Sequence, residues 1–322
     1  MYRGIAEIPA GFGPSVAAIG NFDGVHRGHQ QILGAAVVEA RQRGMRAVAI
    51  TFDPHPDKFL RPAEAPGLLT PMEHRLCLLA ATGVDAIVVL PFNETLARQT
   101  AREFVQTVLV DALDVRGLHE GGNFRCGHRA EAGVRELAEF GAEFGFGLTV
   151  HDAVRVHGLE VSSSATRAYV AAGDVKRARW MLGRPFAVRS TQKRDRGVGA
   201  RLLVPTVNLA EYDGLLPAFG IYVTRLTVGE RCFQAVSSLG NRPTFEGAGF
   251  AVETHILNFE PVEMDETTPL ELEFLMRLRD EEKYPTVELL KAQILRDVAQ
   301  AKRYFRLVAT EASRTPEAEL GH

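Results

Sequence analysis

The chain has 322 residues, about twice a typical domain, and its 46% apolar and 24% charged residues are the usage of an ordinary globular protein. A net charge of −3 gives no overall basic field for DNA or RNA, and three scattered cysteines without a C-x-x-C pair argue against a disulfide scaffold or a zinc site. No long apolar run and no secretory leader is visible, so we expect no membrane span and a cytoplasmic protein.

Short apolar runs alternate with amphipathic stretches through the first half of the chain. We predict strands at residues 15–20, 46–52, 86–90, 115–120 and 148–154. Between them we predict helices at residues 29–43, 71–82, 100–112 and 134–144. Strands that alternate with helices in this way indicate a parallel sheet with both faces covered.

The pattern changes after two further short helices, expected at about 164–171 and 175–181. Strand-like segments then follow one another directly, at residues 204–209, 221–228, 232–239, 251–259 and 270–278, with a hairpin turn at 228–231. One long helix, at about 286–305, ends the region. Consecutive strands without helices between them predict a small antiparallel β-barrel with a C-terminal helix.

The change of pattern places the domain boundary near residues 182–185. We therefore predict an α/β domain at 1–183 and a barrel domain with its closing helix at 184–309. The polar residues 310–322 are expected to be a disordered tail.

The segment GNFDGVHRGH, from Gly20 to His29, begins at the end of the first predicted strand and enters the first helix. A parallel sheet places its ligand crevice at such a junction, and free N–H groups at a helix start favour phosphate. His26 and His29 are three residues apart, so both rings can point the same way and neutralise charge on a phosphate. One histidine here is more often a cap or a surface residue, but a pair around a glycine favours function.

Three later segments also bring polar groups to loops or helix starts. Two prolines flank His55 and would hold it rigidly, although a plain turn is an equal interpretation. Asn123 follows two glycines, where it could bind a phosphate or cap a turn. Ser163 and Ser164 precede a predicted helix, where capping is the usual role, but together with Arg167 they would form an anion site.

The segment GNFDGVHRGH resembles the signature of the nucleotidylyltransferase superfamily, which shares its H-x-G-H motif with class I aminoacyl-tRNA synthetases. The longer string resembles one family within it, the prokaryotic bifunctional riboflavin kinase/FMN adenylyltransferases, or bacterial FAD synthetases. Residues 51–56 (TFDPHP), 122–127 (GNFRCG) and 161–167 (VSSSATR) are similar to later motifs of that family. Cys126, Ser164 and Thr166 stand where the family has phenylalanine, threonine and isoleucine.

The second half resembles riboflavin kinase in residues 205–209 (PTVNL), 240–245 (GNRPTF), 252–255 (VETH) and 278–284 (LRDEEKY). Hydroxyl and amide oxygens suit Mg²⁺, and a carboxylate near the attacking hydroxyl can serve as base. Residues 197–204 (GVGARLLV) depart from the family, because Ala200, Leu203 and Val204 replace an arginine, a glycine and an aromatic residue. Leucine resists the positive φ that glycine allows, so this departure bears on the kinase step.

The resemblance covers about residues 15–305 and implies a nucleotidylyltransferase-type doubly wound sheet followed by the barrel. It implies catalytic roles for His26, His29 and Glu253, the last as base for the riboflavin 5′-hydroxyl. It implies ATP or phosphate contacts at Gly20, Phe22, Asp23, Gly28, Asn123, Ser163, Ser164, Arg167, Gly197, Gly199, Thr206 and Asn208. It implies flavin contacts at His55, Asp174 and Arg279, and Mg²⁺ at Thr206 and Asn208.

These observations lead us to expect a bifunctional enzyme that phosphorylates riboflavin to FMN and adenylylates FMN to FAD. Its partners would be riboflavin, FMN and ATP with Mg²⁺, and no nucleic acid or membrane. Three alternatives stay open. They are a tRNA synthetase fragment, for which no K-M-S-K-S-like loop is found, a monofunctional FMN adenylyltransferase with a degenerate flavin-binding second domain, and a flavin-sensing binding protein.

Overall fold

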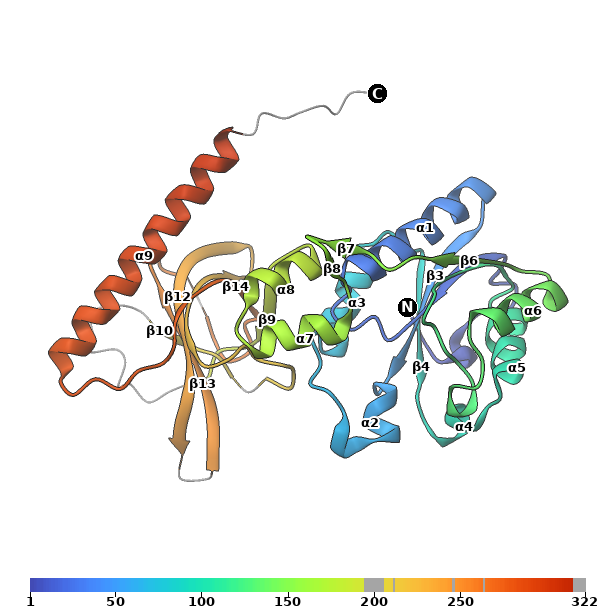
Figure 1. The fold of residues 1–322 in the computed structure, drawn as a ribbon, viewed down its shortest axis with the longest axis horizontal. Helices are drawn as coiled ribbons and strands as arrows, with labels where there is room; N and C mark the ends of the chain where they lie inside the picture. The colour runs from blue at the N-terminus through green and yellow to red at the C-terminus, as the bar shows by residue number, and fades with distance from the viewer. Residues whose placement is uncertain (194–205, 211, 245–246, 263, 315–322) are drawn as a thin grey trace. The chain divides into compact units, whose positions relative to one another are not determined.

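The computed structural model describes residues 1–193, 206–210, 212–244, 247–262 and 264–314, and the chain forms two compact units (Figure 1). Unit 1 comprises Met1–Thr166 and Met181–Gly183, and unit 2 comprises Arg167–Trp180 and Arg184–His322. The stretch Arg167–Trp180, which we expected in the first domain, therefore groups with unit 2. Among the described residues, no helix is both long enough and apolar enough to cross a membrane.

Unit 1 is built on a six-stranded parallel sheet with the order β1-β4-β3-β2-β5-β6. The strands are β1 (Tyr2–Arg3), β2 (Ser15–Ile19), β3 (Arg46–Asp53), β4 (Ala86–Pro91), β5 (Val115–Gly121) and β6 (Gly147–His151). The strand order runs in opposite directions on either side of β2 and β5, so the sheet has its topological switch point between these two strands.

Helices cover both faces of this sheet, as predicted (Figure 1). They are α1 (Arg27–Arg43), α2 (Pro56–Leu60), α3 (Met72–Ala80), α4 (Glu94–Arg98), α5 (Ala101–Phe104) and α6 (Val134–Phe144), with a π-helical segment, η3 (Val105–Ala112), after α5. Alternate residues of β2 face opposite cores: Ala18 is buried with Leu33 of α1, whereas Ala17 is buried with Leu109 of η3 and Leu137 of α6.

Several elements of unit 1 differ from the prediction. The helix expected at 100–112 is divided into α5 and η3, although its apolar residues Val105, Val108 and Leu109 are buried as expected. The strand expected at 148–154 ends at His151, because its partner β5 ends at Gly121 and leaves nothing further to pair with. The short helices α2 and α4 were not predicted, since five residues are too few to show a helical period.

Unit 2 contains a curled, six-stranded antiparallel sheet with the order β10-β13-β12-β11-β14-β9. The strands are β9 (Phe186–Ser190), β10 (Thr206–Asn208), β11 (Gly220–Val228), β12 (Arg231–Thr244), β13 (Gly247–Ile256) and β14 (Leu270–Arg279). A bridge between Gln192 and Leu209 joins the two ends of this order, as the predicted barrel requires. The β11–β12 hairpin turns between Val228 and Arg231, where we predicted it.

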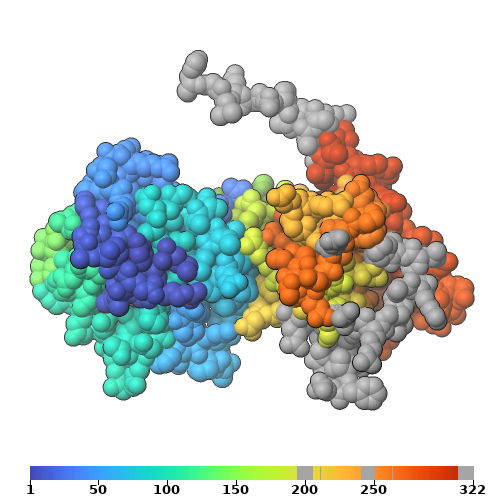
Figure 2. Space-filling view, turned by 180° about the vertical axis from the view of Figure 1, so that it is seen from behind, coloured from blue at the N-terminus to red at the C-terminus, as the bar shows by residue number. Residues whose placement is uncertain are grey.

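The remaining helices are α7 (Ser163–Ala171), α8 (Val175–Leu182) and α9 (Val287–Arg314), and a small hairpin, β7 (Arg155–Val156) with β8 (Leu159–Glu160), precedes α7. Helix α9 lies at the surface of unit 2, in red in Figure 2. It continues beyond the predicted end into residues 310–314, which we expected to be disordered. Residues 305–314 contain no glycine or proline that would end the helix. The next proline along the chain is Pro316.

Some strands of unit 2 were missed or were predicted with other bounds; β13, predicted at 251–259, is one of these. Strand β9 was missed because its five residues directly follow the proline of the domain junction and show little alternation. Strand β12 extends to Thr244, beyond the predicted end at 239, because it pairs with β13 along this whole length.

Candidate active sites

The loop that follows β2 is held by buried apolar side chains. Phe22 and Val25 have left-handed backbones, with φ of 47° and 39°, and both side chains belong to the core cluster that contains Leu33. Gly24 also has a positive φ, and a Cβ there would come within 2.8 Å of Leu69 Cδ1. A left-handed L-residue costs about 1–2 kcal/mol, and such strain persists where the surrounding packing fixes the chain.

The carboxylate of Asp23 fastens this loop to the segment before α3. It accepts hydrogen bonds from the backbone N–H groups of Leu69 (3.0 Å) and Thr70 (2.9 Å), and Arg75 Nη2 lies 4.0 Å away. The Gly24 N–H donates to Thr70 Oγ1 at 2.9 Å. Asp23 is fully buried. Its side chain therefore holds the loop in shape and does not face solvent.

The two histidines of the H-x-G-H motif form a stacked pair at the start of α1. Their ring centroids are 3.6 Å apart at an interplanar angle of 16°, and the ring of Phe22 meets His29 edge-on at 5.2 Å. The prediction that both rings point the same way is confirmed. His26 Nδ1 accepts the His29 backbone N–H at 3.3 Å, so the neutral His26 ring carries its proton on Nε2.

Gly28 leaves room for this pair. A Cβ at this position would lie 3.2 Å from Cε1 of His26, closer than most real contacts. Helix α1 has no acidic residue in its first turn. Its N-terminal N–H groups and the two imidazoles therefore supply N–H donors at the strand–helix junction, and the helix dipole there favours a phosphate.

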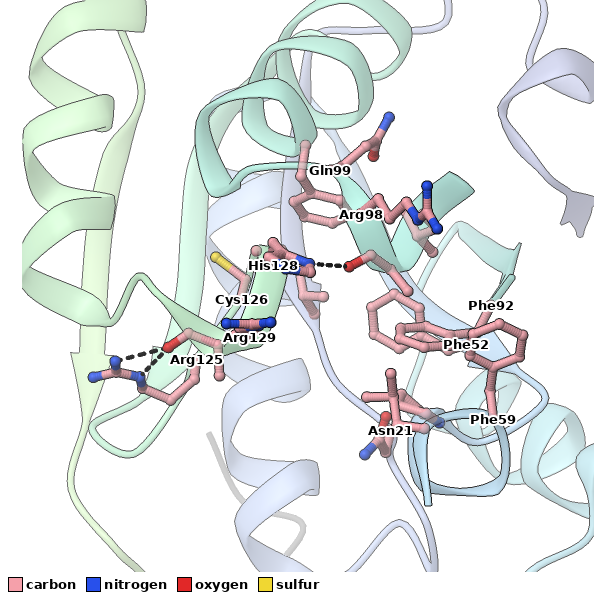
Figure 3. A pocket seen from close by; sticks show the side chains of 18 of the residues that line it. Asn21, Phe52, Phe59, Phe92, Arg98, Gln99, Arg125, Cys126, His128 and Arg129 are labelled. Atoms are coloured by element: carbon pink, nitrogen blue, oxygen red, sulfur yellow. Dashed lines mark hydrogen bonds between the residues drawn. The ribbon is translucent and has the colours of Figure 1, made fainter. Parts of the chain in front are cut away.

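A cavity of about 880 Å³ lies next to this junction in unit 1 and shares Gly20 and Asn21 with it (Figure 3). Apolar rings gather on one side of the view in Figure 3, where Phe92 lies edge-on between Phe52 and Phe59 with centroids 5.9 Å apart in each pair. Polar and cationic side chains gather on the other side, from the loop after β5; they are Arg125, Cys126, His128 and Arg129. The cavity can therefore hold a planar ring with one apolar and one polar edge.

A buried carboxyl group, that of Glu120, lies at the switch point between β2 and β5. It accepts the backbone N–H of Ile19, a cavity-lining residue, at 2.8 Å. Burial without a cationic partner raises the pKa of Glu120 well above its usual value. Nearby, burial also raises the pKa of the Cys126 thiol to about 12, so this cysteine is not a thiolate nucleophile at neutral pH.

The start of α7 is tied to the same loop. The Ser163 hydroxyl donates to the Asp23 carbonyl oxygen at 3.0 Å. Ser162 caps the helix, because its Oγ accepts the Ala165 N–H at 3.2 Å. The prediction that Ser163 or Ser164 is the cap is therefore wrong by one residue: Ser163 is already helical, and Ser164 is exposed on the first turn.

In unit 2, β10 places the predicted kinase residues beside β13. Asn208 pairs directly with Glu253, and Thr206 pairs with His255 two residues along the same face. Val252, Thr254 and Ile256 are buried, whereas Glu253 and His255 are partly exposed, so β13 has one buried face and one partly exposed face. The paired positions bring a carboxylate, an amide and a hydroxyl together on one face.

Arg279 and Asp174, the predicted flavin contacts of unit 2, both have protein partners. The Arg279 guanidinium binds the buried Asp297 carboxylate of α9, with an Nη2–Oδ2 distance of 2.8 Å, and this hydrogen bonding raises its pKa. Asp174 caps α8, because its carboxylate accepts the Arg177 N–H at 3.0 Å.

Comparison with known proteins identifies both units. A family model described as FAD synthetase matches residues 10–165, and one described as riboflavin kinase matches residues 182–305. A bifunctional riboflavin kinase/FMN adenylyltransferase from Pseudomonas fluorescens is 33% identical over 94% of this chain and 96% of its own length. The chain belongs to this family.

Further likenesses agree with this membership. The bifunctional riboflavin kinase/FMN adenylyltransferase of Escherichia coli strain K12 is 33% identical over 91% of this chain and 93% of that protein. A crystal structure described as a macrolide-efflux protein from Streptococcus pneumoniae has a TM-score of 0.82 and 24% identity, and covers 94% of this chain and 99% of that one. At this level of identity the likeness shows the fold alone.

The structure gathers some of the residues that the family resemblance implied and not others. Unit 1 contains Gly20, Phe22, Asp23, His26, Gly28, His29, His55, Asn123, Ser163 and Ser164. Unit 2 holds Arg167, Asp174, Thr206, Asn208, Glu253 and Arg279. Gly197 and Gly199 lie outside the described residues. His55 caps α2 by accepting the Asp57 N–H at 3.2 Å, next to the cavity residue Pro56.

The sequence reasoning missed the aromatic side of the cavity and two residues near its polar side, Glu120 and Arg129. A signal for the aromatic side exists: Phe52 is the last residue but one of β3, and Phe92 directly follows β4. Aromatic residues at the carboxyl ends of neighbouring parallel strands meet at one edge of the sheet. A glutamate near the end of a buried strand, as in VRGLHEG, is a second signal, because a buried carboxyl group needs a hydrogen-bond partner or must stay protonated.

Proposed function

We propose that this member of the family phosphorylates riboflavin to FMN in unit 2 and transfers AMP from ATP to FMN in unit 1, giving FAD and pyrophosphate. The stacked His26–His29 pair at the start of α1, adjoining the aromatic cavity through Gly20 and Asn21, is the observation that carries the second reaction. Anion chemistry and a site for a planar ring thus adjoin each other within one unit.

In the adenylyl transfer, an FMN phosphate oxygen attacks the α-phosphorus of ATP. A new P–O bond forms, the bond to the β-phosphate bridging oxygen breaks, and pyrophosphate leaves with that electron pair. His26 donates from Nε2 and His29 from its ring to the phosphate oxygens, and the N–H groups at the start of α1 add to this stabilisation. The FMN phosphate is itself the nucleophile, which agrees with the protonated state of Cys126.

The remaining residues of unit 1 fall into direct and indirect roles. Gly20 and Asn123 line the cavity and are proposed to contact substrate, and His55 is proposed to contact flavin from its edge. Asp23 acts indirectly, because its carboxylate is used inside the protein. Phe22, Gly28 and Ser163 likewise shape the loop that ATP approaches.

In the kinase step, Glu253 is proposed to accept the proton of the riboflavin 5′-hydroxyl as that oxygen attacks the γ-phosphorus of ATP. The Thr206 hydroxyl and the Asn208 amide oxygen lie on the face of β10 that meets Glu253, and oxygen donors of this kind fit Mg²⁺. A bound Mg²⁺ would supply charge neutralisation at the phosphates. Arg279, held by Asp297, is proposed to position the β14–α9 connection near flavin, and Asp174 is proposed to contact flavin from the start of α8. Arg167 is proposed to bind an ATP phosphate in adenylyl transfer.

A monofunctional adenylyltransferase is the second candidate, favoured by Ala200, Leu203 and Val204 in the segment before PTVNL. The two candidates separate when the purified protein is incubated with riboflavin, ATP and Mg²⁺, and the flavins are resolved by chromatography. We expect both FMN and FAD. FAD formed from supplied FMN but never from riboflavin would establish the monofunctional enzyme, and the absence of both products would leave a flavin-binding protein. We also propose a cytoplasmic location, which is supported by three free cysteines.

A further inference from the structure

The loop after β5, residues 126–132, is a closed turn at the edge of the unit 1 cavity. Cys126 and Ala132 exchange two backbone hydrogen bonds, of 2.9 and 3.1 Å. The Ala130 carbonyl oxygen accepts from Arg125 Nε at 3.0 Å and Nη2 at 2.7 Å, as drawn in Figure 3. Glu131 accepts the backbone N–H of Ala101 at 2.7 Å. These contacts fix the loop backbone from both sides.

Two consecutive L-residues of this loop have left-handed backbones. Arg129 has φ 55° and ψ 28°, and Ala130 has φ 56°. Glycine or asparagine usually occupies such positions, because a Cβ crowds the following carbonyl group. Such strained backbones are often found at binding and active sites, where the surrounding contacts hold them in place. Here the strain holds an arginine at the cavity.

Arg129 differs from the other arginines of the same cavity. Arg125 is bound to the Ala130 carbonyl, and Arg98 forms an ion pair with Glu94 at 2.5 Å. Within the described parts of the chain, the structure shows neither a carboxylate nor a carbonyl oxygen paired with the Arg129 guanidinium. Figure 3 shows Arg129 beside His128, on the side of the cavity opposite the aromatic rings.

A planar ligand stacked along Phe52, Phe59 and Phe92 would turn its far edge toward this guanidinium. A guanidinium presents a fork of N–H donors, and it is most specific for an edge that carries adjacent acceptors. The carbonyl-bearing pyrimidine edge of a flavin ring has this chemistry, whereas its dimethylbenzene edge suits the phenylalanines. The phosphate of FMN must instead reach His26 and His29, on the Gly20–Asn21 side of the cavity.

We propose that Arg129 is a specificity residue that binds the carbonyl-bearing edge of the flavin ring during adenylyl transfer. The proposal deepens, and rests on, the assignment of FMN to this cavity. A contact that substrate and transition state share raises KM when it is lost and leaves kcat nearly unchanged.

The test compares Arg129→Ala with wild type in FAD synthesis from FMN, with lumiflavin, which is the ring without the phosphate chain, as competitive inhibitor. We expect KM for FMN and the inhibition constant of lumiflavin to rise together, by about ten- to a hundredfold, as for a charge-assisted hydrogen bond. The two constants of Arg129→Lys should lie between those of wild type and Arg129→Ala, because lysine keeps the charge but lacks the forked pair of N–H donors. Arg135→Ala, which removes an exposed arginine of α6 that pairs with Glu136 and lies outside the cavity lining, is the control and should change neither constant.

Three outcomes would overturn the proposal. The first is that both constants stay unchanged in Arg129→Ala. The second is a raised KM for FMN with unaltered lumiflavin inhibition, which would assign Arg129 to the phosphate. The third is an equal effect in Arg135→Ala. Arg129→Gly separates a binding role from a structural one. Because glycine tolerates the positive φ, this variant should have a higher melting temperature than wild type while its flavin binding weakens. If Arg129 had only a structural role, the melting temperature of Arg129→Gly would fall. If wild type makes no FAD, the proposed function fails, and lumiflavin binding followed by fluorescence in wild type and Arg129→Ala still decides the role of Arg129.

Discussion

At the scale of single residues, the protonation of the buried Glu120 carboxyl is coupled to folding. Its pKa in the folded chain lies well above that of an exposed glutamate, because burial disfavours the charge. The unfolded chain releases this proton above about pH 4.5, while the folded chain keeps it to a higher pH. The stability that the protonated group contributes is therefore complete at low pH and is lost as pH rises through the folded pKa.

This coupling predicts the behaviour of Glu120→Gln. The amide keeps the acceptor for the Ile19 N–H and cannot ionise. Between pH 5 and pH 8, the free energy of unfolding of the variant should fall less than that of wild type, and the variant should be the more stable protein at pH 8. Urea denaturation across this range measures the difference. Parallel pH profiles for the two proteins would show that Glu120 ionises equally in the folded and unfolded states.

His29 carries the residue-scale prediction for adenylyl transfer. His29→Ala removes one ring of the stacked pair and should lower kcat/KM for FAD formation by about a hundredfold or more, as for a lost transition-state contact. FMN formation from riboflavin should persist. Gln31→Ala, an exposed change on the same helix, is the control. Near-normal FAD synthesis by His29→Ala would remove this histidine from the mechanism.

At the scale of elements, the pairing of β10 with β13 decides which side chains serve the kinase step. Glu253 faces Asn208 in direct register, with the buried Val252 and Thr254 on the opposite face. Glu253→Gln preserves the shape and cannot accept a proton. We expect the variant to keep its fold and its affinity for riboflavin but to lose most of its kcat for FMN formation.

Two comparisons make this prediction specific. FAD formation from supplied FMN should be unchanged in Glu253→Gln, because the adenylyl transfer site lies in unit 1. Glu230→Gln, in the exposed β11–β12 turn, should leave both reactions unchanged. A normal rate of FMN formation in Glu253→Gln would show that this carboxylate is not the base.

The elements also show how far sequence could go. Runs such as SVAAI and AIVVL predicted β2 and β4, because a buried parallel strand is apolar on both faces. The pairing of His26 with His29 was also predictable, because the two residues are only three positions apart in the sequence. The cavity was not, since Phe52, Phe59 and Phe92 come from separate segments and meet only in the fold. Arg129 was hidden because its distinguishing feature is a backbone conformation, which no residue pattern reveals.

At the scale of the whole molecule, two units carry two reactions, and the chain passes between them more than once. Arg167–Trp180 groups with unit 2, and Gly173 lies so close to Tyr222 that a Cβ there would be 2.7 Å from its hydroxyl oxygen. A fragment of residues 167–314 should therefore unfold at a higher temperature than a fragment of residues 184–314. Equal melting temperatures would show that α7 and α8 do not stabilise unit 2 and would favour the predicted domain boundary near residues 182–185.

The central claim is that one chain performs phosphoryl transfer and adenylyl transfer in sequence on a flavin. It is tested most directly by incubating the full chain with riboflavin, Mg²⁺ and ATP labelled separately at the γ- or the α-phosphorus, and by following the label in each flavin with time. We predict that the γ-label enters FMN first and is retained in FAD, and that the α-label enters FAD alone. Absence of the α-label from every flavin would contradict adenylyl transfer, and FAD that never carries the γ-label would contradict the kinase step.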